Sequence, residues 1–295
     1  MILQIVGIVF PIFAIVLAGY LYGRRHSPDM SAANKLNIEI FTPALIFEVL
    51  IGKDFDPFNY LGLALSSTAI VLGSLLLAWP VARLMGYQFR TFVPPMMFSN
   101  SGNMGLPLAL LAFGEQALPA AIVLFITMNL LHFSLGFKIM DSEAPLIGLL
   151  RIPMLIATFL GLLVGQSGIS LPEVVTLPIG MLGQISIPLM LFALGVRLIH
   201  VNRRDWQIGA VGAIVRPLTG VLIAILMGLL LDLPQEQFNL LVVFGSLPPA
   251  VLNFMVAERF QQEPQKVASI VLIGNVASIL FVPLALAYAL APAAG

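Results

Sequence analysis

Ten stretches of this chain are long and apolar enough to cross a lipid bilayer as helices, and their succession constrains the fold more than any other feature. A membrane-spanning helix needs about 20 mostly apolar residues. Charged residues or turn formers separate the stretches, which lie at residues 3–22, 34–51, 60–85, 90–113, 117–139, 149–166, 174–199, 206–231, 238–260 and 266–290. The sequence therefore predicts an all-α membrane protein with ten transmembrane helices.

Composition agrees with this fold class and argues against several functions. Of the 295 residues 59% are hydrophobic and 9% are charged, and the mean hydropathy is +1.02, which leaves too few polar side chains to cover a soluble protein. Cysteine is absent, and the three histidines are not spaced as a metal pair, so we expect no metal and no cofactor. The net charge of zero argues against a nucleic-acid partner. No spaced carboxylate pair or P-loop is present, so we expect neither an enzyme with catalytic residues nor direct nucleotide drive.

The distribution of Lys and Arg predicts how the chain lies in the membrane, because cytoplasmic loops carry an excess of these residues. The even-numbered connections between the stretches hold only Lys53. The odd-numbered connections hold twelve basic residues: Arg24, Arg25, Lys35, Arg83, Arg90, Lys138, Arg151, Arg197, Arg203, Arg204, Arg259 and Lys266. We therefore expect both termini on the non-cytoplasmic side. We read the first stretch as a membrane span and not as a cleavable signal peptide, since it has no basic leader.

Several short patterns recur in the same order in the two halves of the chain. The spacing of Pro11, Gly19 and Gly23 recurs in Pro153, Gly161 and Gly165. Residues 43–47 resemble residues 188–192, and residues 122–124 resemble residues 270–272. These patterns predict a duplicated unit of five spans, residues 1–139 and 149–295. Because each unit has an odd number of spans, the second would enter the membrane from the opposite side, as an inverted repeat.

A pair of prolines interrupts both the fourth and the ninth stretch, at Pro94-Pro95 and at Pro248-Pro249. Proline removes a backbone donor, and paired interruptions in corresponding membrane segments are the best sequence indication of a transporter's binding site. We expect the second half-helices to begin near Asn103 or Met104 and near Val251 or Leu252. In an inverted repeat their N-termini, which carry partial positive charge, would face one point at the membrane midplane and attract an anion.

Polar and small residues follow the first proline pair. The side chains that would donate hydrogen bonds to a carboxylate are Ser99, Asn100, Ser101 and Asn103. Neutral donors hold an anion without fixing a permanent charge in hydrocarbon. The alternative is that these amides only cap the broken helix ends. Gly102 and Gly105 would allow close packing where the two interrupted helices cross.

Other polar residues inside the predicted spans are candidates for the same site. Asn253 follows the second proline pair, and Asn129 and Asn275 lie in the equivalent spans five and ten. Arg216 would pair with a substrate carboxylate or a protein carboxylate, or extend to the cytoplasmic surface. His132 is a candidate proton carrier because its ordinary pKa lies near neutrality, with a buried core histidine as the alternative.

The segment SNSGNMGLPL at residues 99–108 resembles the fourth-span signature of the auxin efflux carrier family, which includes plant PIN proteins and bacterial permeases for small carboxylates. IFTPALIF at residues 40–47 and PPAVLNFMVAERF at residues 248–260 resemble the second-span and ninth-span motifs. The resemblance covers essentially the whole chain. By analogy Asn100 matches a substrate-contacting asparagine, whereas Asn253 falls where plant members carry a proline.

The resemblance implies ten helices in which spans 4 and 9 are interrupted and cross. Spans 3–5 and 8–10 would form a transport domain, and spans 1, 2, 6 and 7 a scaffold that commonly makes a homodimer. The implied setting is a bacterial inner membrane, with the lipid bilayer and a small carboxylate as partners.

The sequence thus favours a secondary transporter of small organic anions, mono- or dicarboxylates, that works by alternating access in an elevator-like manner. Two alternatives stay open. One is a sodium- or proton-coupled symporter similar to the bile acid symporters. The other is a membrane sensor that binds a lipid or metabolite without transporting it.

Overall fold

The computed structural model describes residues 2–52, 55–143, 148, 151–200 and 205–291, and every extended element of secondary structure in these ranges is helical. The all-α prediction is therefore confirmed for the described residues. Three of the basic residues used to predict orientation, Lys53, Arg203 and Arg204, lie outside them.

Helices of membrane length account for six of the predicted spans. Among the described residues the segments that are long and apolar enough to cross a membrane are α1 (Ile2–His26), Pro57–Leu84 with α4 (Leu61–Leu84), Glu115–Met140 with α7 (Leu118–Leu131) and α8 (Phe137–Met140), α10 (Glu173–Arg197), α11 (Trp206–Leu230) and α14 (Pro264–Ala289).

The four other predicted spans are built from shorter pieces. Their helices are α2 (Ser31–Leu36), α3 (Thr42–Leu50), α5 (Phe89–Met97), α6 (Leu106–Phe113), α9 (Pro153–Gln166), α12 (Gln235–Gly245) and α13 (Leu252–Arg259). Short π-helical turns precede α3, α6 and α8, at Asn37–Phe41, Ser101–Gly105 and His132–Gly136. The helical structure of the predicted fourth and ninth spans is interrupted, after α5 and after α12, whereas α11 and α14 continue through their single internal prolines.

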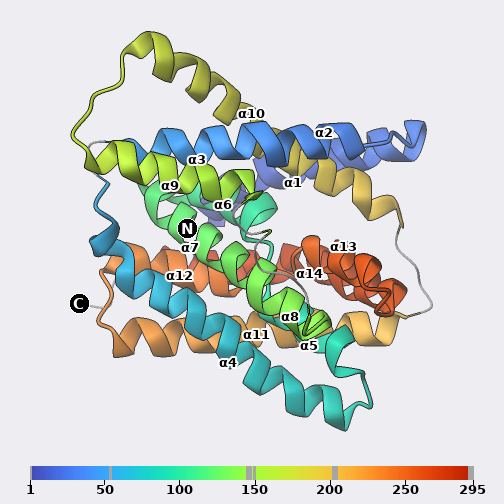
Figure 1. Cartoon of the computed structure of the whole chain (residues 1–295). Coiled ribbons are helices and arrows are strands. Elements are labelled where there is room, and N and C mark those ends of the chain that lie inside the picture. Colours follow the sequence, from blue (N-terminus) through green and yellow to red (C-terminus); the bar gives the residue numbers. More distant parts are fainter. Residues whose placement is uncertain (1, 53–54, 144–147, 149–150, 201–204, 292–295) are drawn as a thin grey trace.

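The helices form two groups that Figure 1 shows one above the other. In the upper group α1 packs against α10, and α3 packs against both α9 and α10. In the lower group α11 contacts α4, α12 and α14, and α4 also contacts α5 and α7. The two interrupted helices thus belong mainly to the lower group, with α6 reaching α1 in the upper one.

Glycines that recur in the two halves allow close helix packing in the upper group. A Cβ atom at Gly19 of α1 would lie only 2.2 Å from the carbonyl oxygen of Phe192 in α10. A Cβ atom at Gly165 of α9 would lie 2.4 Å from the carbonyl oxygen of Leu50 in α3. Small residues that let backbones approach are typical of packing between membrane helices.

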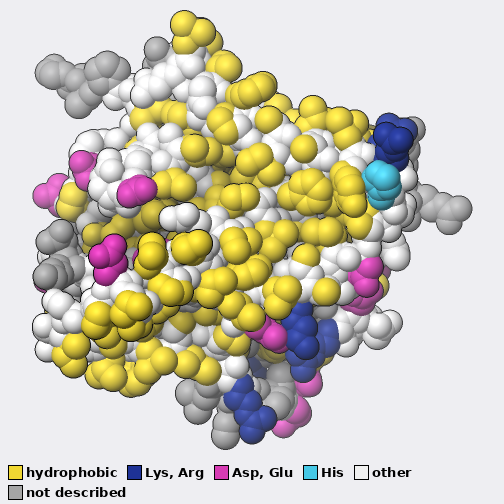
Figure 2. Space-filling view, turned by 90° about the horizontal axis from the view of Figure 1, so that it is seen from above, with side chains coloured by type: hydrophobic (Ala, Val, Ile, Leu, Met, Phe, Trp, Pro, Cys, Tyr) yellow, Lys and Arg dark blue, Asp and Glu magenta, His cyan; other side chains and the backbone are white. Residues whose placement is uncertain are grey.

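The surface between the two ends of the molecule is apolar. In Figure 2 hydrophobic side chains are spread over much of the face seen, and the Lys and Arg side chains of the described residues lie away from its left-hand end. Individual side chains are strongly exposed, for example Phe10 at 68% and Leu229 at 71%. Such a surface is costly in water and suits contact with lipid tails.

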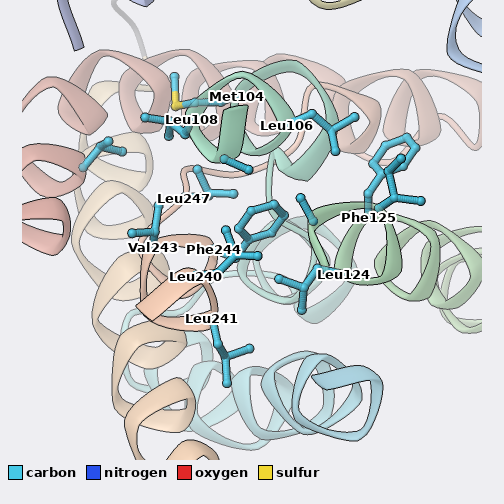
Figure 3. Packing of buried hydrophobic residues seen from close by; sticks show 14 of the residues in the cluster. Met104, Leu106, Leu108, Leu124, Phe125, Leu240, Leu241, Val243, Phe244 and Leu247 are labelled. Carbon is cyan, nitrogen blue, oxygen red and sulfur yellow. The ribbon is translucent and has the colours of Figure 1, made fainter. Parts of the chain in front are cut away.

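The two interrupted helices share one apolar core. Figure 3 shows side chains of α6, α7 and α12, among them Leu106, Leu124 and Phe244, pointing toward one another. A Cβ atom at Gly105 would lie 2.9 Å from the Phe244 ring and 3.0 Å from Leu247, so a larger residue would displace these side chains. The first half of the chain is thereby packed against the second next to the interruptions.

Candidate functional site

The interruptions of the fourth and ninth spans lie against each other. The backbone N–H of Asn100 donates to the carbonyl oxygen of Pro248 at 2.8 Å, and the N–H of Ala250 donates to Phe98 at 2.9 Å. Ser99 and Pro249 thereby form a short antiparallel bridge. Unwound backbone inside a membrane survives only when its polar groups find partners in the protein or in water. Each interruption supplies those partners for the other.

The prolines do not occupy equivalent places. Pro248 and Pro249 lie in the ninth-span interruption, but Pro94 and Pro95 lie in the last turn of α5, before the unwound segment that starts at Phe98. Proline cannot donate a helical hydrogen bond, but the carbonyls that Pro94 and Pro95 leave without a donor lie one turn earlier, so α5 continues to Met97.

The second half-helices begin close to the predicted residues. In the fourth predicted span helical structure resumes with the π-helical turn Ser101–Gly105, which contains Asn103 and Met104. In the ninth span α13 begins at Leu252, as predicted.

A cavity of about 130 Å³ lies where the interruptions meet, and we call it the small cavity. Its lining comes from both helix groups. The lower group contributes Ser99, Asn100, Ser101, Gly102, Asn103, Phe125, Met128, Asn129, His132, Phe133, Ala250, Val251, Leu252 and Met255; the upper group contributes Asn34, Asn37, Ile38, Thr42, Met154, Met190, Ala193 and Arg197. All three π-helical turns named above border it. Such turns are frequent at functional sites.

Four residues that line the small cavity have backbone N–H groups without an acceptor among the described residues. The N–H groups of Gly102 and Asn103, at the start of the second half of the fourth span, have no hydrogen-bond acceptor among the described residues. The same holds for Val251 and Leu252 at the start of α13. All four residues line the cavity. Two half-helix N-termini, each with partial positive charge, therefore converge on one space.

The buried side chains of Asn100 and Asn275 form hydrogen bonds that hold the two interruptions together. Asn100 Nδ2 donates to Asn275 Oδ1 at 2.9 Å, and Asn275 Nδ2 donates to the carbonyl oxygens of Pro249 at 3.1 Å and Val271 at 2.7 Å. Asn275 thus links α14 to both interruptions.

Asn253 has a comparable place on the other side of the crossing. Its Nδ2 donates to the carbonyl oxygens of Phe98 and Ala250, both at 3.0 Å. It is buried and does not line the small cavity. This geometry is that of a group that completes the unwound backbone, while Asn100 has contacts to both the network and the cavity.

Asn103, Asn129 and His132 lie at the cavity wall. Asn129 Nδ2 donates to the Phe125 carbonyl oxygen in its own helix, at 2.8 Å, and the side chain of Asn103 has no hydrogen bond within the described part of the chain. The His132 ring stacks on the Phe98 ring, with centroids 4.1 Å apart and planes within 5°. The structure thus brings together the predicted residues of spans 4 and 5.

Sequence reasoning missed the upper-group side of the cavity. Asn37 is buried, and its Oδ1 has no hydrogen-bond partner among the described residues. Thr42 lies on the same side and shares a 2.9 Å hydrogen bond with Ser186 of α10. Arg197, in the last turn of α10, was taken only as a basic residue of a connection. The signal available was the group of polar residues, including Asn34, inside a predicted span.

A second, larger cavity of about 1160 Å³ adjoins the small one. The residues common to both linings are Asn34, Ile38, Arg197, Val251 and Met255. The larger cavity is also bordered by residues 28–31, between α1 and α2, by Glu258 near the end of α13 and by Asn275. It therefore extends from the crossing toward the connections that carry most of the basic residues.

Arg216, a candidate substrate ligand, lies away from the small cavity. Arg216 is fully buried in α11 and lines neither cavity. Its Nη1 donates to the carbonyl oxygen of Gly245 at 3.3 Å.

Within the described ranges no group of three or more His, Cys, Asp or Glu residues could hold a metal ion.

A polar contact outside the spans ties the start of α5 to the start of α14. Glu263 accepts a 2.6 Å hydrogen bond from Thr91 Oγ1 and forms an ion pair with Lys266. Partial burial alone would raise the pKa of Glu263, but the hydrogen bonds from Lys266 and Thr91 hold this pKa below its ordinary value. The start of α5 is thus held next to the start of α14.

Comparison with known proteins gives one family. A model of the family described as "Membrane transport protein" matches residues 4–147 and 142–286. A Rhizobium meliloti protein named "Putative malonate transporter" is 26% identical over 305 aligned positions, covering 94% of this chain and 93% of the relative.

Two further relatives carry less specific names. An uncharacterized transporter of Methanocaldococcus jannaschii is 24% identical, with 94% of this chain and 96% of the relative covered. An uncharacterized transporter of Escherichia coli K12 is also 24% identical, with 86% and 88% covered. All three alignments span most of both chains.

Proposed function

Because this chain belongs to the membrane transport protein family, the relatives of the auxin efflux carriers, we propose that it carries small carboxylates across the membrane by alternating access. The family and the relatives make the protein a membrane transporter and not an enzyme. Substrate and mechanism are inferred from the geometry of the crossing.

The observation that carries the proposal is the convergence of unpaired donors on the small cavity. Four residues whose backbone N–H groups have no acceptor among the described residues, Gly102, Asn103, Val251 and Leu252, line a space also lined by Asn100. A carboxylate placed there would accept several of these hydrogen bonds and would lie at two partially positive helix ends. Because none of these donors carries a formal charge, they would bind the anion weakly enough for it to dissociate.

Arg197 favours a substrate with two carboxylates. It lines both cavities from the upper group, opposite the crossing. The sole ion pair among the described residues joins Lys266 and Glu263, so no described carboxylate lies within 4 Å of the Arg197 guanidinium. The small cavity, at about 130 Å³, is much smaller than the adjoining cavity of about 1160 Å³, which favours a short acid. The name of the Rhizobium meliloti relative is consistent with a short diacid.

The arrangement of the helices suggests how such a site would change its exposure. We assign the upper group to the predicted scaffold and the lower group to the predicted transport domain, as two inverted five-span repeats with a total of ten spans. Since the small cavity has lining residues from both groups, movement of the lower group would carry the crossing past the scaffold, in an elevator-like manner. The large cavity would then be the route to the cytoplasmic side.

Uptake by proteoliposomes tests the proposal. Radiolabelled malonate and succinate are compared with acetate and propionate, with and without imposed proton and sodium gradients. We expect Arg197→Gln to lower diacid uptake about tenfold or more, since a hydrogen-bonded charge contributes about 1.5–3 kcal/mol and 1.4 kcal/mol is a factor of ten. Monoacid uptake should change little. Arg83→Gln, at an exposed basic residue of α4 that lines neither cavity, is the matched control.

Three results would contradict the proposal in different ways. If no acid moves under any gradient but acids bind, the protein is a sensor. If acids move and Arg197→Gln affects both classes equally, the second-carboxylate assignment is wrong. If uptake requires a proton gradient and His132→Gln abolishes that requirement, the symporter alternative is the correct one.

A further inference from the structure

Arg216 has a position that the proposed carboxylate site does not explain. It is the one Asp, Glu, Lys or Arg side chain among the described residues that is buried, with an exposure of 0%. No described carboxylate lies within ion-pair distance of it. Burying an unpaired charge costs several kcal/mol even after relaxation, so the position calls for a reason beyond packing.

The guanidinium of Arg216 lies at the C-terminal end of a half-helix. The last four carbonyl groups of α12 belong to residues 242–245 and have no partners within the helix itself. The N–H of Ser246 reaches Val242 and Val243, and the N–H of Leu247 reaches Phe244. The carbonyl oxygen of Gly245 accepts instead from Arg216 Nη1. Arg216 thus completes the end of α12, immediately before the ninth-span interruption.

The packing around this contact is tight. A Cβ atom at Gly220 of α11 would lie 2.1 Å from the Gly245 oxygen and 2.2 Å from Arg216 Nη1. Gly220 and Gly245 therefore allow α11 to pack against the end of α12. A side chain larger than hydrogen at Gly220 would collide with the guanidinium. Nε and Nη2 of Arg216 have no acceptor among the described residues. The positive charge is not cancelled locally.

A half-helix C-terminus carries partial negative charge. In secondary transporters with interrupted helices, such ends and the adjoining unwound carbonyls coordinate the coupling cation. A guanidinium has the same sign of charge, donates to the same carbonyls and does not lose its proton in proteins. A side chain held there occupies the place that a soluble cation would take.

We propose that Arg216 is a tethered cation that permanently fills the cation position at the end of α12, so that the crossing needs no sodium ion. The claim that transport needs no sodium ion rests on the proposed function. The claim that Arg216 fills the cation position does not. In Arg216→Ala, which lacks the guanidinium, the vacated position should accept guanidinium or sodium ions from solution.

The first experiment measures thermal unfolding of the purified protein in detergent and needs no transport. Tm is recorded for the unaltered chain and for Arg216→Ala, with Arg83→Gln as the control, in choline chloride and after addition of millimolar guanidinium or sodium chloride. We expect Arg216→Ala to lower Tm by about 5 °C or more, since about 1 kcal/mol corresponds to roughly 2–4 °C for a chain of this size. Guanidinium or sodium should restore part of this loss in Arg216→Ala alone.

The same measurement includes a test of charge against packing. Arg216→Lys keeps a cation and should retain more stability than Arg216→Met, which keeps length without charge. If Arg216→Met is as stable as the unaltered chain, or if no added cation raises the Tm of Arg216→Ala, the proposal is overturned.

The second experiment measures carboxylate uptake with sodium replaced by choline. We expect uptake by the unaltered chain to stay within about twofold, and uptake by Arg216→Ala to fall about tenfold and recover partly with guanidinium or sodium, as for removal of a hydrogen-bonded charge. Uptake by the unaltered chain that stops without sodium would refute the tethered cation. If the unaltered chain moves no carboxylate at all, the proposed function fails, and the Tm measurements alone decide the role of Arg216.

Discussion

Asn275→Ala should destabilise the protein by separating the two interruptions. Asn275 makes two hydrogen bonds outside its own helix, one from Asn100 Nδ2 and one to the carbonyl oxygen of Pro249. Its bond to Val271 is local, because Val271 lies one turn earlier in α14. Hydrogen bonds between membrane helices average about 0.6 kcal/mol and reach about 1.7 kcal/mol, and both lost partners lie at the crossing. We therefore expect a loss of about 2 kcal/mol in the free energy of unfolding.

The matched control is Asn129→Ala, which changes the same residue type in the equivalent fifth predicted span. The Asn129 amide bonds only to the Phe125 carbonyl oxygen, in the same helix. Removing it should cost less than about 0.5 kcal/mol, as for a local contact of this kind. The difference between the two variants therefore isolates the tertiary network.

Thermal unfolding in detergent and hydrogen exchange provide the measurement. A loss of about 2 kcal/mol should lower Tm by roughly 6 °C. The backbone N–H groups of Asn100 and Ala250, which pair across the interruptions, should exchange faster in Asn275→Ala. If Asn275→Ala and Asn129→Ala have equal Tm values and these two amides keep their protection, the fastening role of Asn275 is refuted.

Two further predictions concern stability. Gly195→Ala should cost about 3 kcal/mol, because its Cβ atom would lie 1.9 Å from the carbonyl oxygen of Val16 and would force α1 away from α10, whereas Gly7→Ala meets nothing within 4 Å and should be neutral; equal Tm values would contradict this. Glu263→Gln should cost about 1 kcal/mol at pH 7, as expected for a partly exposed charged hydrogen bond. Since the hydrogen bond from Thr91 and the neighbouring ammonium hold the pKa of Glu263 below its ordinary 4.5, the difference between the two proteins should shrink as the pH falls below 4.5. A difference in Tm that does not vary with pH would show that the carboxylate charge is not involved.

The sequence predicted the helical class and the place of the ninth-span interruption, because both follow from local chemistry. Apolar length indicates a membrane helix, and the ninth-span interruption coincides with its prolines. The fourth-span interruption does not, since α5 accommodates Pro94 and Pro95 before it ends. Its position is set by Ser99 meeting Pro249, a contact 150 residues apart that no local pattern reveals.

Some side chains of the site could be predicted from the local sequence, and others could not. Asn100 and Asn103 were predicted because they follow an interruption, and both reach the small cavity. Asn37 and Arg197 were missed because they become neighbours of that cavity only through the packing of the upper helix group against the crossing. Arg216 was noticed as an unusual intramembrane charge, but its partner, a backbone carbonyl at the end of α12, cannot be read from residue types.

The backbone pairing between the interruptions also has a consequence for how the chain is made. The free polar groups of Phe98 and Asn100 find their partners at Pro248, Ala250 and Asn253, which the ribosome adds about 150 residues later. Until then the first half cannot be buried in lipid without stranding these groups. During synthesis the unfinished crossing must therefore stay beside water or the insertion machinery. The two halves cannot mature one after the other as independent units, because the crossing forms only after the second interruption has been made.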